Sequence, residues 1–65
     1  MPEYTNSQIK ELIDEWIHSE RERAILKRRL IDGITFEALA EEYDMSVRGM
    51  KYLVYKLQKI LFKHL

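Results

Sequence analysis

The last twenty residues hold the side chains best suited to binding chemistry, because five of them are basic and none is acidic. At about 100° per residue, the basic residues share one side of a helix with aromatic residues. This set is Arg48, Lys51, Tyr52, Tyr55, Lys56, Lys59, Phe62 and Lys63. Basic side chains neutralise phosphates, and tyrosines bond phosphate oxygens or pack on sugars and base edges. The pattern predicts a surface for a polyanion; the alternative is an ordinary solvated face.

Catalysis has little support in the sequence. His18 and His64 stand alone in a chain without cysteine, which predicts no metal site, and we expect His18 at a helix end and His64 at a frayed terminus. The pairs Glu37/Glu41 and Glu41/Glu42 could be imagined as an acid and a base, but helix spacing beside an apolar stripe predicts a solvated face. The sequence therefore predicts no enzyme, metal or cofactor.

Charge is distributed unevenly, although the net charge is zero. Through Glu22 there are six acidic residues against Lys10 and Arg21. A second basic cluster then follows, made of Arg23, Lys27, Arg28 and Arg29. Helix dipoles explain part of this pattern, but not the acid-free end of the chain.

Length and composition predict one small domain spanning residues 1–65. No apolar run approaches the roughly 20 residues of a membrane span, and the first residues lack the features of a signal peptide. We therefore expect a cytoplasmic protein without a membrane partner.

Capping signals divide the chain into four helices. After a lead-in at Met1–Tyr4, Thr5 and Gln8 have capping-box spacing, and Tyr4 with Ile9 forms a hydrophobic staple. The first helix, within residues 1–18, carries the apolar stripe Ile9, Leu12, Ile13, Trp16 and Ile17, which places Trp16 in the core. Ser19 and Glu22 form a second capping box, and the helix from Glu20 ends at Asp32-Gly33, with Gly33 left-handed. Its apolar positions are Ala24, Ile25, Leu26, Leu30 and Ile31.

Residues 34–55 form a helix-turn-helix pattern. Thr35 caps a helix with the stripe Phe36, Leu39, Ala40 and Tyr43, and Asp44 suits a left-handed turn. Ser46 caps the last helix, which starts at Val47 and runs almost to the C-terminus. Its core side is predicted as Met50, Leu53, Val54, Leu57, Ile60, Leu61 and Leu65. The fold predicted is an all-α four-helix bundle.

In a helix-turn-helix the start of the second helix enters the major groove, so Arg48, Lys51 and Tyr52 are best placed for base edges. Lys56, Lys59 and Lys63 lie further along and are expected to follow the DNA backbone or to stay in solvent. Ser46, Tyr55 and Lys56 complete the predicted interface.

From Glu20 to about Leu61 the chain resembles region 4 of bacterial sigma factors, especially the extracytoplasmic-function type. The matching features are RERAIL, Asp32-Gly33, ITFEALAEEYDMS, and the spacing of Met50, Leu53 and Leu57. Within the single domain, residues 19–65 are the part that resembles this family. It implies binding of promoter-type duplex DNA and contact with RNA polymerase. Carried onto this sequence, the DNA-facing residues are Val47, Arg48, Gly49, Lys51 and Tyr52, with Thr35 near phosphate.

The chain departs from that family in three ways. Asp44 stands where the family usually has glycine. Gly49 lies inside the recognition helix and destabilises it by about 1 kcal/mol relative to alanine. Either this glycine permits the backbone to approach DNA closely, or the helix makes fewer base contacts than its relatives do. So short a chain has no region 2, so we expect a stand-alone regulator, with a phage or mobile-element type fitting best.

The rival function is a protein-interaction module. Tyr55 and Phe62, seven residues apart, could form a stripe that contacts RNA polymerase or a second copy of the chain. A homodimer is also compatible with DNA binding, since it would supply two recognition helices. The salt dependence of binding distinguishes the two functions, because binding through phosphate contacts weakens steeply as the salt concentration rises.

Overall fold

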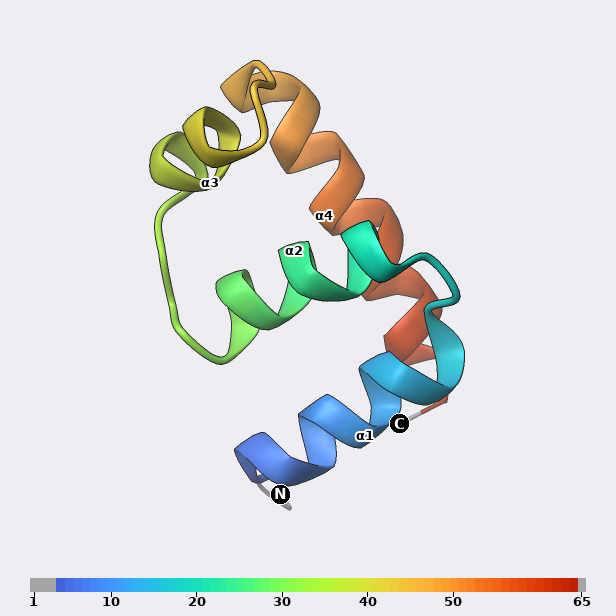
Figure 1. The fold of residues 1–65 in the computed structure, drawn as a ribbon. Coiled ribbons are helices and arrows are strands. Elements are labelled where there is room, and N and C mark those ends of the chain that lie inside the picture. Colours follow the sequence, from blue (N-terminus) through green and yellow to red (C-terminus); the bar gives the residue numbers. More distant parts are fainter. Residues whose placement is uncertain (1–3, 65) are drawn as a thin grey trace.

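The computed structural model describes residues 4–64, so the lead-in expected at residues 1–3 and the apolar position Leu65 lie outside it. The chain forms α1 (Asn6–Trp16), α2 (Glu20–Leu30), α3 (Phe36–Glu42) and α4 (Val47–Phe62). The described residues contain no strand. The helix α4 is the longest of the four, and α3, α2 and α1 each pack against it (Figure 1). The predicted all-α four-helix domain is confirmed.

A serine or threonine begins every helix, as predicted. The hydroxyls of Thr5, Ser19, Thr35 and Ser46 accept hydrogen bonds from backbone N–H groups three residues further on, over 3.0–3.4 Å. Gln8 returns a bond from its side chain to the Thr5 N–H, which completes that capping box. For Ser19 and Glu22 the described structure contains only the serine half of the box. These caps satisfy N–H groups that a helix start otherwise leaves without partners.

Two residues with a left-handed backbone conformation turn the chain, one before α3 and one after it. Gly33 has φ +72° after α2, and Asp44 has φ +55° after α3. The Met45 N–H donates to the Ala40 carbonyl at 2.8 Å, and the Asp44 N–H donates to the Glu41 carbonyl at 3.3 Å. This bonding pattern is that of a Schellman motif with aspartate at its left-handed position. The predicted roles of Gly33 and Asp44 are confirmed.

All four helices contribute to one apolar core. Its buried members are Ile13, Ile17, Ile25, Leu26, Leu39, Ala40, Met50, Val54, Leu57 and Leu61. Trp16 is half-buried against them, and Leu53 and Ile60 lie at the core's edge. No helix within residues 4–64 is long and apolar enough to cross a membrane.

Candidate nucleic-acid interface

The outer face of α4 is the candidate interface. All eight residues predicted for it are exposed: Arg48, Lys51, Tyr52, Tyr55, Lys56, Lys59, Phe62 and Lys63. Tyr52 is 75% exposed and Tyr55 is 53% exposed, which is unusual for side chains with so much apolar area. The division of α4 into a core side and an outer side is therefore confirmed.

Within residues 4–64, no ion pair joins a basic residue of α4 to an acidic one, since the three ion pairs found there involve only Lys27 and Arg28 as cations. Lys51 lies over the ring of Phe36, with its Nζ 5.8 Å from the ring centroid. A phosphate approaching this face would meet basic groups that no carboxylate of the described chain neutralises.

The second basic cluster, on α2, contacts its own chain instead. Arg23 donates to the carbonyls of Ile17 and Asp14. Lys27 pairs with Asp14 at 2.7 Å, and the Lys27 hydrogen bond lowers the pKa of the Asp14 carboxyl. These contacts fasten α2 to α1 and to the segment that follows it.

The rest of this cluster fastens α2 to α3. Arg28 pairs with Glu42 at 3.0 Å and with Asp32 at 3.2 Å, and these two carboxylates raise the pKa of its guanidinium. Arg29 donates to the Ile34 carbonyl at 2.8 Å. The contacts of this cluster therefore hold the domain together and do not leave its charges open to a polyanion.

Phe36 connects α3 to the candidate interface, a role that the sequence did not reveal. The centroid of its ring lies 4.2 Å from the Arg29 guanidinium carbon. The same ring meets the Tyr55 ring edge-on, with the two centroids 5.8 Å apart and the ring planes at 72° to each other. Together with Lys51 above the same ring, these contacts set where Lys51 and Tyr55 sit on the surface. Spacing placed Phe36 on the apolar stripe of its helix, but no local pattern indicates which cations it meets.

The helix starts contribute two hydroxyls. Thr35 and Ser46 are exposed, and each hydroxyl accepts a backbone bond while keeping its proton free to donate to a phosphate oxygen. Val47 is half-buried and packs against the core, so only part of it faces outward. A Cβ at Gly49 would lie 3.0 Å from the Ser46 Oγ. Glycine at position 49 therefore also leaves room for the cap.

The aromatic and basic residues of α4 border a shallow depression of about 250 Å³. Tyr52, Tyr55, Lys56 and Lys59 line it. A hollow with tyrosine walls and lysine rims suits a sugar-phosphate segment, because the rings supply packing area and the ammonium groups supply charge.

The histidines and glutamates considered for catalysis are all exposed. In the described part of the chain, no group of three or more histidines, aspartates or glutamates could hold a metal ion. Glu37 and Glu41 are exposed, and Glu42 binds Arg28. His64, expected at a frayed terminus, lies beyond the end of α4, and its ring stacks on that of Trp16 with the ring centroids 3.5 Å apart.

Comparison with known protein families, with curated proteins and with solved structures finds no match for this chain.

Proposed function

We propose that this chain is a helix-turn-helix protein that binds duplex DNA and acts in transcriptional regulation without catalysis. In this proposal α3 lies across the DNA backbone and α4 is the recognition helix in the major groove. Arg48, Lys51 and Tyr52 contact base edges, while Thr35, Ser46 and Lys56 contact phosphates. The resemblance to sigma factor region 4 supports the same assignment.

One observation carries the proposal: the basic groups of α4 are exposed and lack acidic partners within residues 4–64, whereas α2 directs its basic groups to its own chain. The aromatic side chains between them add contact area, since Tyr52 and Tyr55 are more than half exposed. A face that contacts only solvent does not require exposed tyrosines next to cations that lack acidic partners.

Fluorescence anisotropy of a labelled random-sequence duplex, titrated at several salt concentrations, tests the proposal. We expect binding that weakens steeply with salt, because each neutralised phosphate releases counterions. A sequence selection with the same protein should then yield a preferred site. Absence of binding at low salt would contradict DNA recognition.

The depression lined by Tyr52, Tyr55, Lys56 and Lys59 favours a second candidate, an interaction module that contacts RNA polymerase. An acidic, partly apolar protein surface fits the same residues. Its binding would change much less with salt than binding to DNA, because an aromatic interface releases few counterions.

A further inference from the structure

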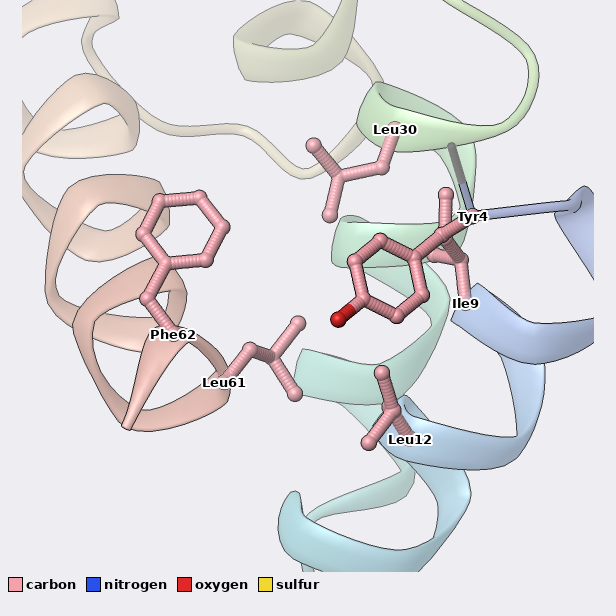
Figure 2. A pocket seen from close by; sticks show the side chains of 6 residues that line it. All are labelled: Tyr4, Ile9, Leu12, Leu30, Leu61 and Phe62. Atoms are coloured by element: carbon pink, nitrogen blue, oxygen red, sulfur yellow. The ribbon is translucent and has the colours of Figure 1, made fainter. Parts of the chain in front are cut away.

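A second feature of the surface lies at the opposite end of α4 from Ser46. An apolar hollow of about 190 Å³ opens there between α1, the end of α2 and the end of α4. Figure 2 shows Leu61 and Phe62 on one side of it and Tyr4, Ile9 and Leu12 on the other, with Leu30 between them. Phe62 is 60% exposed and Tyr4 is 42% exposed. Two large rings therefore border an apolar recess that is open to solvent.

The two rims of the hollow carry opposite charges. On the α1 side, Glu11 and Glu15 are exposed and line an adjoining depression that shares Tyr4 and Leu12 with the hollow. On the α4 side, Lys59 and Lys63 are exposed beside Phe62. An acidic rim, an apolar centre and a basic rim thus follow one another across one face.

We infer that this face binds a second copy of the same chain in a two-fold symmetric homodimer. With the two-fold axis perpendicular to the line that joins the rims, each rim of one copy lies against the other rim of its partner, so Glu11 and Glu15 meet Lys59 and Lys63 twice. A partner of uniform charge would face a like-charged rim on one side. The Phe62 ring of each copy enters the hollow of the other.

An interface of ordinary size would cover only part of the surface of this chain. A stable interface buries about 800 Å² per partner, roughly a sixth of the 4779 Å² that this chain exposes. The hollow alone is too small for that area, so the contact extends over both charged rims. An apolar centre with a charged border is also the usual anatomy of such interfaces.

This inference goes beyond the proposed function and does not depend on it, although the two are geometrically compatible. Arg48 and Phe62 are separated by fourteen residues of α4, or about 21 Å of helix. Two helices that meet near Phe62 therefore hold their Arg48 residues up to about 42 Å apart. DNA half-sites one helical turn apart need about 34 Å, which inclined helices provide.

Sedimentation equilibrium without DNA tests the inference. The parent chain should change from 7.9 kDa to twice that mass as concentration rises. Phe62→Ala should raise the dimer dissociation constant about tenfold or more, because exposed aromatic residues at the centre of an interface carry much of its affinity. Tyr52→Ala is the matched control: Tyr52 is a still more exposed aromatic residue of α4, outside the hollow, and its loss should leave self-association unchanged.

Exchanging the charges of the two rims provides a second test of the homodimer. The variants Glu11→Lys/Glu15→Lys and Lys59→Glu/Lys63→Glu should each be monomeric, while an equimolar mixture should form heterodimers. Circular dichroism of each variant establishes that it is folded. A parent that stays monomeric, a Phe62→Ala chain that associates like the parent, or folded variants that fail to pair in the mixture would each overturn the inference. A monomeric parent that binds DNA would refute the dimer alone, and a dimer that ignores DNA would refute the proposed function alone.

Discussion

The basic side chains of α2 contact their own chain, whereas those of α4 face solvent. Arg23, Lys27, Arg28 and Arg29 reach carbonyls, carboxylates and an aromatic ring that belong to neighbouring helices or to the segment between α2 and α3. Arg48, Lys56 and Lys59 are exposed, and within residues 4–64 they form no ion pair. Two clusters of similar size and charge thus have different consequences: the first holds helices together, and the second is open to a ligand.

The difference teaches that the number of basic residues in a segment does not define a surface for polyanions. A cation that already has a carboxylate partner must lose that contact before it binds phosphate, and its charge is partly cancelled at longer range. The variants below separate the two regions, since variants of α4 should change binding and variants around α2 should change stability.

The largest effect is expected for Arg48→Ala/Lys51→Ala. Removing two groups from the reading face should weaken DNA binding by about 2–4 kcal/mol, or roughly 30- to 1000-fold. Anisotropy titrations measure the affinity. The melting temperature should change little, because both residues are exposed and neither forms an ion pair within residues 4–64.

The matched control for that variant is Lys27→Ala/Arg28→Ala, which changes the net charge by the same amount. It removes the three ion pairs of the described chain. Stability should fall only slightly, since such partly exposed pairs contribute little each. DNA affinity should remain near that of the parent, and an equal loss of affinity in both variants would mean that overall charge alone drives binding.

Arg29→Ala should lower the free energy of unfolding by about 2 kcal/mol, because a charged hydrogen bond and a cation–π contact are lost together. The bond is the one to the Ile34 carbonyl, and the ring is that of Phe36. Urea denaturation measures the change. Arg29→Lys keeps the charge without the planar guanidinium, so stability as low as that of the alanine variant would identify guanidinium geometry as the cause.

Gly33→Ala should cost about 1 kcal/mol by the same measurement. The cost comes from backbone strain at φ +72°, since an added Cβ meets no atom within 4 Å. Asp44→Gly is the reverse control: it relieves φ +55° at the other turn and should gain about 0.5 kcal/mol or more. Equal losses in the two variants would contradict the strain argument.

The smallest effect concerns pH. The pKa of Asp14 is lowered from 3.8 by its bond to Lys27, so this contact stabilises the fold above that pH. The stabilisation is lost as pH falls through the lower, folded-state pKa. Thermal melting of the parent and of Asp14→Asn should therefore differ slightly at neutral pH and converge in strong acid; a gap that persists in acid would assign the effect to something other than the carboxylate charge.

Local chemistry predicted most of the fold. The side chain of a capping residue accepts a hydrogen bond from the backbone N–H three positions later. The four helix starts were therefore predictable from Thr5, Ser19, Thr35 and Ser46. Helix periodicity likewise separated the core side of α4 from its outer side. Both patterns depend only on neighbours in sequence.

Contacts between helices were harder to predict. The cations of α2 form a cluster in the sequence, but their partners Asp14 and Glu42 lie thirteen and fourteen residues away. The stack of His64 on Trp16 joins the end of the described chain to the end of α1. Such pairs depend on how helices cross and which rotamers then fit, and neither is encoded in local spacing.

The central claim is that α4, and not α2, supplies the charge that meets DNA. The slope of log affinity against log salt tests it most directly, because each phosphate contact contributes about −0.9 to that slope. Measured for the parent, for Lys56→Ala/Lys59→Ala and for the charge-matched Lys27→Ala/Arg28→Ala, the slope should become shallower by about one to two units in Lys56→Ala/Lys59→Ala. It should not change in Lys27→Ala/Arg28→Ala. A parent slope near zero, or an equal change in both variants, would contradict the account.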